Sequence, residues 1–174
     1  MKVTYYAAMS SDGFIARQDG DVSWLDDLDI DYSCTGYEDF FASVDGLVMG
    51  RGTYDFILGY GSWPYEDKPA WVCTNHTLKT LPDASLNISK SPQQVIDEAG
   101  QQGLTHLWLV GGGKLASAFL DAGLLTHLFI SEMPVTLSAG VPLFSDHTIG
   151  GLRVEQQKSI QQKGFKQLKI GIKL

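Results

Sequence analysis

The sequence has few of the features that mark secreted, membrane-spanning or metal-binding proteins. Its two cysteines, Cys34 and Cys73, are far apart and show neither a zinc-ligand spacing nor a C-x-x-C motif. The amino terminus has no apolar core of signal-peptide length, and no run of about 18 apolar residues occurs. The four histidines are scattered. We therefore expect a cytoplasmic protein without a metal site, in which both cysteines are small buried residues.

Positive charge is also scarce. The chain has 13 Lys and Arg against 20 Asp and Glu, a formal net charge of -7. Nucleic acids and anionic membranes both favour basic surfaces, so we expect neither as the main partner. Residues 19–45 hold nine acids and no base, whereas residues 151–174 hold six bases and one acid. Both segments are expected to form solvated faces.

The length and the apolar content favour a single domain. A chain of 174 residues with 44% apolar residues can bury one full core, whereas two domains would each be thin. No internal repeat, low-complexity segment or linker divides the sequence. We therefore expect one domain over residues 1–174.

Short apolar runs alternate with helical patterns in the first two thirds of the chain. The runs are rich in β-branched or aromatic residues, which is typical of buried strands. Strands are expected at residues 2–9, 46–50, 70–74, 85–89 and 106–110.

Three helices are expected between and after these strands. One begins at Ser91, where Ser-Pro-Gln-Gln supplies an N-cap and a capping box, and ends before Gly103. A second should run over residues 32–44, and a third over 113–122. Strands that alternate with helices predict an α/β fold with a mostly parallel sheet.

The pattern changes after residue 125. Residues 126–135 read as a strand, 140–144 as a brief extended turn, and 152–160 with 164–174 as an antiparallel hairpin. In the last strand, apolar residues at 168, 170, 172 and 174 alternate with lysine or glycine, so one face should be buried. The sheet should therefore end in an antiparallel edge.

Three glycines, Gly111, Gly112 and Gly113, stand between an expected strand and an expected helix. Unpaired backbone N–H groups and the positive end of the helix dipole could hold a phosphate there, and Lys114 would add a charge. The stretch fits neither G-x-x-x-x-G-K-[ST] nor G-x-G-x-x-G. The alternative is a tight turn that lets the helix pack closely on the sheet.

A second strand-to-helix junction strengthens the phosphate interpretation. In "LVMGRGTYDFI" (47–57), Gly50 leaves room for a ligand, Arg51 offers a guanidinium and Thr53 a hydroxyl. Two such junctions suit one long ligand with two phosphates. Thr74, Asn75 and His76 follow the strand at 70–74 and form a third candidate group. The alternative for Arg51 is a surface ion pair.

Over nearly its whole length the chain resembles the dihydrofolate reductase-like superfamily, and within it the branch that contains the riboflavin-biosynthesis reductase domain. The motifs that carry the resemblance are "AAMSSDGFIA" (7–16), "SWL" (23–25), "FFASVDGLVMGRGTYD" (40–55), "LWLVGGGKLASAFLDAGLLTHLFISEMPV" (107–135) and "SAGVPLF" (138–144). The resemblance implies a central sheet of about eight strands with helices on both faces. It also implies a homodimer that pairs through the C-terminal strands.

The resemblance further implies that NADPH lies extended across the carboxyl ends of the strands. The residues that match the family's cofactor-binding motifs fall into four groups. Those near the nicotinamide are Ala8 and Ile15; those near the phosphates and adenosine are Gly50, Arg51 and Thr53; those near the pyrophosphate are Gly111, Gly112, Gly113, Lys114 and Leu115; those near the 2′-phosphate are Thr74, Asn75 and His76.

The proton donor and the substrate are less defined by the motifs. Asp12 would lie in the loop that covers the nicotinamide and is the candidate catalytic residue, with a turn aspartate as the alternative. Trp24 and Tyr37 would shape the substrate cavity, and Glu38 could face it from a helix. The carboxylate that binds folate in true dihydrofolate reductases has no clear counterpart, because the segment after Trp24 is longer here.

The resemblance, together with the two glycine junctions, predicts an NADPH-dependent reductase of a small pterin- or pyrimidine-like substrate. Its activity could resemble that of 5-amino-6-(5-phosphoribosylamino)uracil reductase. The alternatives are dihydrofolate reduction, a protein that binds the nucleotide without turnover, and a structural module in which the glycines and Arg51 serve packing alone.

Overall fold

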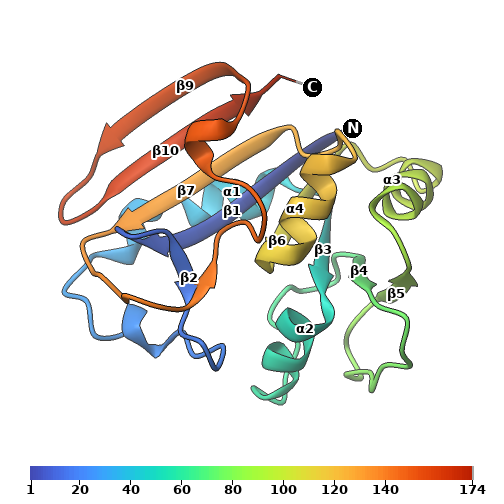
Figure 1. The fold of residues 1–174 in the computed structure, drawn as a ribbon. Coiled ribbons are helices and arrows are strands. Elements are labelled where there is room, and N and C mark those ends of the chain that lie inside the picture. Colours follow the sequence, from blue (N-terminus) through green and yellow to red (C-terminus); the bar gives the residue numbers. More distant parts are fainter. Residues whose placement is uncertain (174) are drawn as a thin grey trace.

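The computed structural model describes residues 1–173, which form one eight-stranded sheet, one two-stranded sheet and four α-helices (Figure 1). The helices are α1 (Tyr37–Ser43), α2 (Arg51–Leu58), α3 (Pro92–Gln101) and α4 (Gly113–Asp121). The strands are β1 (Lys2–Ser10), β2 (Phe14–Ala16), β3 (Gly46–Gly50), β4 (Ala70–Cys73), β5 (Leu86–Ser89), β6 (His106–Gly111), β7 (His127–Met133), β8 (Val141–Pro142), β9 (Val154–Gln161) and β10 (Lys166–Ile172).

The large sheet has the strand order β5-β4-β3-β6-β1-β7-β10-β9. Every pair from β5 to β7 is parallel, whereas β10 runs antiparallel to both β7 and β9. The mostly parallel sheet and its antiparallel C-terminal hairpin are therefore confirmed. Because β6 inserts between β3 and β1, the carboxyl ends of these three strands meet at one edge.

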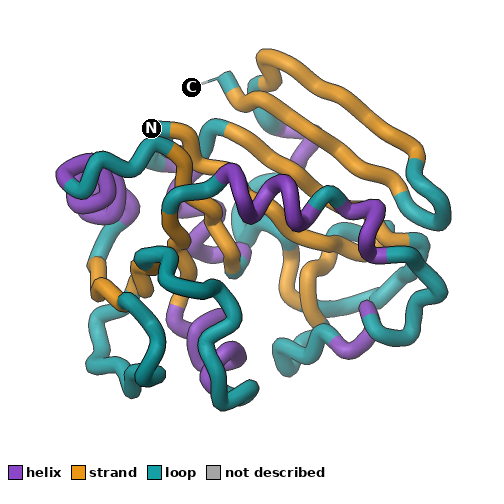
Figure 2. The backbone as a smooth tube through the Cα atoms, turned by 180° about the vertical axis from the view of Figure 1, so that it is seen from behind, coloured by secondary structure: helices purple, strands orange, loops and turns teal. Residues whose placement is uncertain are grey.

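Each face of the sheet packs against two helices. In Figure 1, α4 lies in front of the sheet and α1 behind it, and Figure 2 shows α1 from the other side. One core joins α3 and α4 to the side chains that include Tyr5 and Leu109, and the other joins α1 and α2 to those that include Met49 and Trp108. Successive residues of a strand point to opposite faces of the sheet. Tyr5 and Tyr6 of β1 therefore belong to different cores.

The helix expected over residues 32–44 is divided in the structure. A 3-10 helix spans Tyr32–Thr35, and α1 begins at Tyr37. Gly36 stands between them with a φ of 70°, a left-handed conformation that ends one helix and redirects the chain. Within α1 and at its end, Phe40 and Val44 are buried.

The C-terminal third agrees with the expected elements in most places. The extended turn at 140–144 contains β8, which pairs with β2 in a second sheet that the sequence did not predict. In β10, Leu168, Ile170 and Ile172 are buried, as the alternation predicts, and Leu174 lies outside the described residues.

The prediction that both cysteines are buried is wrong for Cys34, which is exposed beside Asp31, while Cys73 is half-buried at the end of β4. Cys34 lies in the exposed 3-10 segment, which covers little core surface. Among the helices of residues 1–173, none combines the length and the apolar character needed to cross a membrane.

Candidate active site

The two glycine junctions lie side by side at the carboxyl edge of the sheet. Gly50 ends β3 and precedes α2, and Gly111 ends β6, the neighbouring strand. A Cβ atom on Gly50 would lie 3.7 Å from the carbonyl oxygen of Gly111 and 3.8 Å from the amide nitrogen of Gly112. The Thr53 hydroxyl would lie 3.6 Å from a Cβ atom on Gly111. Two segments more than 50 residues apart in sequence thus form one backbone-lined surface.

Both helices that start at this edge lack a side-chain cap. The N-cap residues are Gly50 for α2 and Gly112 for α4, and neither helix receives a side-chain cap hydrogen bond within residues 1–173. In contrast, α3 is capped by Ser91, whose hydroxyl accepts from the backbone N–H of Gln94 at 3.3 Å. The first-turn N–H groups of α2 and α4 therefore remain available to an anion, together with the positive ends of both helix dipoles.

The three successive glycines have different roles in the structure. Gly111 has a φ of 145°, which side chains rarely adopt. A Cβ atom on Gly113 would overlap the carbonyl oxygen of Pro142 in β8, so Gly113 lets α4 press against that strand. A Cβ atom on Gly112 would only touch the Thr53 hydroxyl, at 3.8 Å. Close packing therefore explains Gly113, whereas Gly112 borders the open edge.

Lys114 and Leu115, the other residues expected near the pyrophosphate, occupy the first turn of α4. Lys114 is exposed, so its ammonium group is accessible at this edge. Leu115 is half-buried and packs against the core that joins α3 and α4. The structure thus gives Leu115 a packing role and leaves only its backbone N–H for a ligand.

Arg51 forms a surface ion pair, which was the alternative to a phosphate contact at this residue. Its Nε lies 2.7 Å and 2.8 Å from the two carboxylate oxygens of Asp55, one helical turn later. Its Nη1 donates to the carbonyl oxygen of Thr77 at 3.2 Å, which ties α2 to the loop after β4. The guanidinium is part-exposed and keeps further N–H groups for a ligand.

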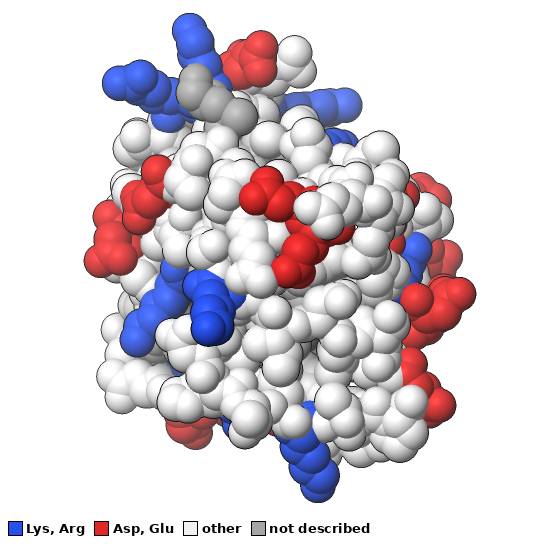
Figure 3. Space-filling model, turned by 90° about the vertical axis from the view of Figure 1, so that its right-hand side faces the viewer, with Lys and Arg blue, Asp and Glu red and all other residues white. Residues whose placement is uncertain are grey.

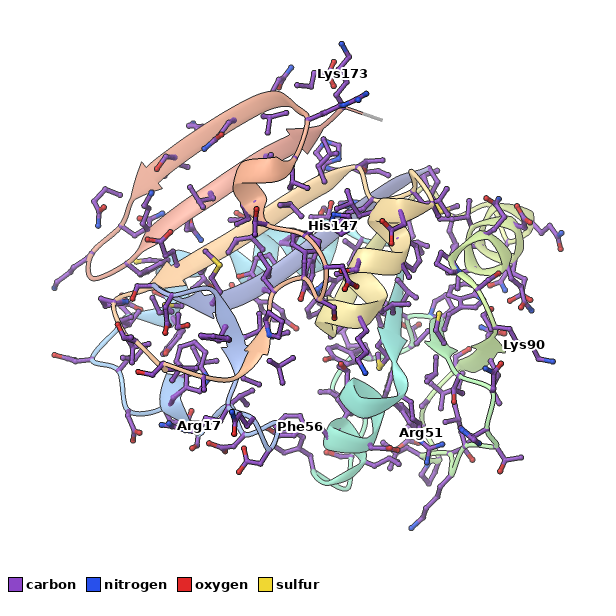
Figure 4. The ribbon with its side chains drawn as sticks, in the orientation of Figure 1. Arg17, Arg51, Phe56, Lys90, His147 and Lys173 are labelled. Carbon is purple, nitrogen blue, oxygen red and sulfur yellow. The ribbon has the colours of Figure 1, made fainter. Side chains whose placement is uncertain are left out.

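The loop after β4 carries the third candidate group next to Arg51. Asn75 and His76 are exposed, and the Thr74 hydroxyl accepts from the backbone N–H of His76 at 3.2 Å. Because β4 neighbours β3, this loop lies beside the amino end of α2 (Figure 4 labels Arg51 there). The structure therefore brings the second and third candidate groups together.

Asp12 connects two loops through its carboxylate. Its carboxylate accepts from the backbone N–H groups of Leu137 and Ser138 at 3.1 Å and 2.8 Å. The neighbouring Ser10 hydroxyl and then these amides lower the pKa of the Asp12 carboxyl. The group thus favours the ionised form, which accepts hydrogen bonds but has no proton to give. The geometry supports a positioning role.

Trp24 and Ala8 belong to a third apolar cluster, beside the carboxyl end of β1. Trp24 is 1% exposed and packs with Met133 and Phe165, and Ala8 is half-buried against the same cluster. The Trp24 indole N–H is buried and has no hydrogen-bond partner among residues 1–173. An unpaired buried donor is costly, so it marks a place where a ligand or a water could accept a hydrogen bond.

The remaining candidates divide between the interior and the surface. Ile15, on β2, is half-buried against the core of α3 and α4. Tyr37 is 37% exposed, and its ring lies 5.7 Å from that of Phe41 and 5.8 Å from that of Trp108. Glu38 is exposed on α1. The structure therefore gives Tyr37 an aromatic environment and does not bring Glu38 to the glycine edge.

A cavity of about 430 Å³ opens beside the glycine edge, between α2 and the loop after β2. Its lining consists of Asp19, Gly20, Asp21, Gly52 and Phe56. Figure 4 labels Arg17 and Phe56 on the two sides of this opening. Sequence reasoning missed Phe56 and Asp55 as neighbours of the site, although the spacing of four residues between Arg51 and Asp55 is typical of a helical ion pair.

Comparison with known proteins identifies the family. The family model for the RibD C-terminal domain matches residues 1–166. The uncharacterized protein YwjB of Bacillus subtilis (strain 168) is 29% identical over 174 residues, covering 99% of this chain and 95% of YwjB. The uncharacterized protein YyaP of the same strain is 26% identical over 151 residues, covering 80% of this chain and 78% of YyaP.

Solved structures share the fold. A provisionally named riboflavin biosynthesis protein from Shewanella sp. PV-4 has a TM-score of 0.79 and 28% identity, with full coverage of both chains. RibD of Acinetobacter baumannii (form 2) has a TM-score of 0.70 and 15% identity, and the match covers 99% of this chain but 58% of RibD. Because this family model matches most of its length, the chain belongs to the RibD C-terminal domain family.

Proposed function

We propose that this protein is an NADPH-dependent reductase that transfers a hydride to a small pyrimidine- or pterin-like substrate. The observation that carries the proposal is the contact between the two uncapped helix N-termini, at Gly50 and at Gly111 and Gly112. Two adjacent sets of free N–H groups suit a pyrophosphate. A role in packing alone would not require the N–H groups to be uncapped. Membership of the RibD C-terminal domain family supports a reductase.

The residues at the carboxyl edge fit an extended dinucleotide. The backbone at Gly50 and from Gly111 to Leu115 would hold the pyrophosphate, with the Thr53 hydroxyl and Lys114 beside it. Arg51 and the loop of Thr74, Asn75 and His76 would meet the adenosine 2′-phosphate, because they lie together at the outer side of the edge. This last contact is the basis for proposing NADPH over NADH.

The other end of the edge would hold the reactive ring and the substrate. When bound, the reduced nicotinamide supplies the hydride, and the protein aligns it with the acceptor. Ala8 and Ile15, from β1 and β2, would border the ring. Asp12 would keep the covering loop in place through Leu137 and Ser138. Trp24 would donate its unpaired N–H toward the substrate side.

The substrate class rests on relatives. A protein from Thermotoga maritima with the same fold is named a diaminohydroxyphosphoribosylaminopyrimidine deaminase and 5-amino-6-(5-phosphoribosylamino)uracil reductase; it matches with a TM-score of 0.69 and 14% identity. The match covers 98% of this chain but 56% of that protein. The shared part supports reduction of a pyrimidine-like ring. Asp19 and Asp21 at the opening disfavour a phosphorylated substrate there.

Two measurements test the proposal in sequence. Calorimetric titration should show NADPH binding in the wild-type chain, and NADPH oxidation should then be followed with a panel of pyrimidines and pterins, including dihydrofolate and 5-amino-6-(5-phosphoribosylamino)uracil. Turnover on a pyrimidine, or on a pterin other than dihydrofolate, would support the main proposal, and turnover on dihydrofolate alone would replace it with folate reduction. Tight binding without turnover would indicate a nucleotide-binding protein, and absence of binding would refute the cofactor site.

A further inference from the structure

Gln167 is a buried polar residue of β10 that lies outside the candidate groups described above. Its side chain is 2% exposed, and its amide nitrogen donates to the carbonyl oxygen of Thr35 at 2.7 Å. Thr35 ends the 3-10 helix that precedes α1, so this bond joins two segments 132 residues apart in sequence. A buried amide destabilises a fold unless it is hydrogen-bonded, and this one is bonded to the chain just before α1.

The orientation of the amide follows from its partners. A carbonyl oxygen only accepts hydrogen bonds, so the nitrogen of Gln167 must face Thr35. The same nitrogen lies 3.4 Å from the Ser131 hydroxyl, and the side-chain oxygen accepts from Nε2 of Gln162 at 3.0 Å. Tyr6 also donates to the Thr35 carbonyl, at a longer 3.4 Å. A buried network in which the groups are paired holds them in one arrangement.

The network lies in line with the proposed nicotinamide position. Gln167 is the cross-strand partner of Ser131 on β7, and Ser131 is the partner of Ala8 on β1. The three residues therefore form one row on one face of the sheet. This face carries α1, because Phe129, two residues before Ser131, packs in the core of α1 and α2. Ala8, at the end of the row, is the residue expected to border the nicotinamide.

The helix α1 runs against the direction of β6, so it begins nearer the carboxyl edge of the sheet. At its end, the carbonyl oxygen of Ser43 accepts from Nδ1 of His106, the first residue of β6, at 2.9 Å. At its start, the Tyr37 ring lies 5.8 Å from that of Trp108, two residues further along β6. Figure 2 shows this face of the sheet, with α1 across the strands. Tyr37 is therefore at the end of α1 that points toward the candidate site.

We propose that Gln167 is a positioning residue for the substrate side of the reductase. By holding the Thr35 carbonyl, it fixes the chain directly before Gly36, whose φ of 70° turns it into α1. The place of Tyr37 depends on that turn. The inference rests on the proposed function, because it takes the hydride acceptor to lie between Ala8 and Tyr37. Without the amide, the buried Thr35 carbonyl keeps one longer contact, and the start of α1 is less firmly held.

The first experiment replaces Gln167 by methionine, which has a similar length and no amide. The acceptor is dihydrofolate or 5-amino-6-(5-phosphoribosylamino)uracil, whichever the wild type reduces faster. In Gln167→Met the KM for this acceptor should rise about tenfold, while the KM for NADPH stays nearly unchanged, because only one end of the site moves. In magnetic resonance spectra, the amide signals of Gly36 and Tyr37 should shift. Those of Gly50 and Gly111, at the glycine edge, should stay in place.

Two further variants serve as control and as a milder change. Gln101→Met makes the same replacement at an exposed position of α3 and should leave both KM values unchanged. α3 packs beside β5, at the far end of the strand order from β10 and on the side of the molecule that Figure 3 shows. Gln162→Ala removes only the partner of the Gln167 side-chain oxygen. It should raise the acceptor KM in the same direction by a smaller factor.

The outcomes separate this role from simple stability and from the proposed function. An unchanged acceptor KM in folded Gln167→Met would overturn the positioning role, and so would equal increases in both KM values, which indicate a general loosening. If Gln167→Met does not fold, Gln162→Ala is judged by the same criteria. Absence of turnover in the wild type would count against the proposed function. The amide signals would then decide the role of Gln167, and unmoved signals of Gly36 and Tyr37 would overturn it.

Discussion

The carbonyl oxygen of Pro142 occupies the place where a side chain on Gly113 would begin. The Gly113 backbone, at the start of α4, therefore lies in direct contact with β8, which in turn pairs with β2 near the proposed nicotinamide position. This contact separates the three glycines by function, because only the first two border the open edge.

Substitution of Gly113 and Gly112 should therefore give opposite results. Gly113→Ala forces a methyl group into backbone and should destabilise the fold by about 1–3 kcal/mol. The methyl group added by Gly112→Ala would meet only the Thr53 hydroxyl. This variant should therefore unfold close to the wild-type temperature, while its affinity for NADPH falls. Thermal unfolding and calorimetric titration of both variants check this. Equal destabilisation by the two substitutions would contradict the separation.

The Thr53 hydroxyl should contribute to cofactor affinity more than to stability. Thr53→Val keeps the shape of the side chain but removes the hydroxyl that lies beside Gly111 and Gly112. We expect NADPH to bind about five- to tenfold more weakly, which corresponds to one lost hydrogen bond. Thr53→Ser, which keeps the hydroxyl, is the matched control and should bind almost normally. Unchanged affinity in Thr53→Val would remove Thr53 from the site.

Arg51 should determine the choice between NADPH and NADH. Arg51→Gln should weaken NADPH binding about tenfold while leaving NADH binding nearly unchanged, because only NADPH carries the 2′-phosphate. Asp55→Asn, which releases the guanidinium from its carboxylate partner, should instead tighten NADPH binding. Stability should change little in either variant, since exposed helical ion pairs contribute only about 0.3–0.5 kcal/mol. Equal effects on both cofactors would contradict this role.

Asp12 should matter for loop position and not for proton donation. Asp12→Asn should retain most of the kcat with the best substrate, whereas a proton donor would lose nearly all of it on this change. Asp12→Ala, which loses both contacts to the loop at 137–138, should raise the KM for NADPH. A loss of nearly all of the kcat in Asp12→Asn would restore the catalytic role.

The lowered pKa of Asp12 also predicts a pH dependence. A carboxyl whose pKa is lower in the folded than in the unfolded state stabilises the fold above the unfolded pKa, about 3.9, and this contribution is lost as the pH falls through the folded pKa. The difference in unfolding temperature between wild type and Asp12→Asn should therefore be largest near neutral pH and shrink below about pH 4. A difference independent of pH would contradict the ionised form.

Much of the fold could be predicted from local patterns. The apolar runs identified the strands of the parallel sheet to within one or two residues, and the Ser91 cap identified the start of α3. The break at Gly36 was missed, because the apolar positions that predicted the helix, Tyr37, Phe40, Phe41 and Val44, all follow the glycine and do not show where the helix begins. The pairing of β2 with β8 was missed as well, since both are too short to show an alternating pattern.

By itself, the sequence determined the features that depend on neighbouring residues: the elements, the cap of α3 and the presence of glycines at two strand-to-helix junctions. Only the tertiary structure decided how those residues are used. It placed Pro142 against Gly113, tied Asp12 to Leu137 and Ser138, and brought Gly50 next to Gly111 and Gly112. Such contacts depend on strand order and chain crossing, which no local spacing encodes.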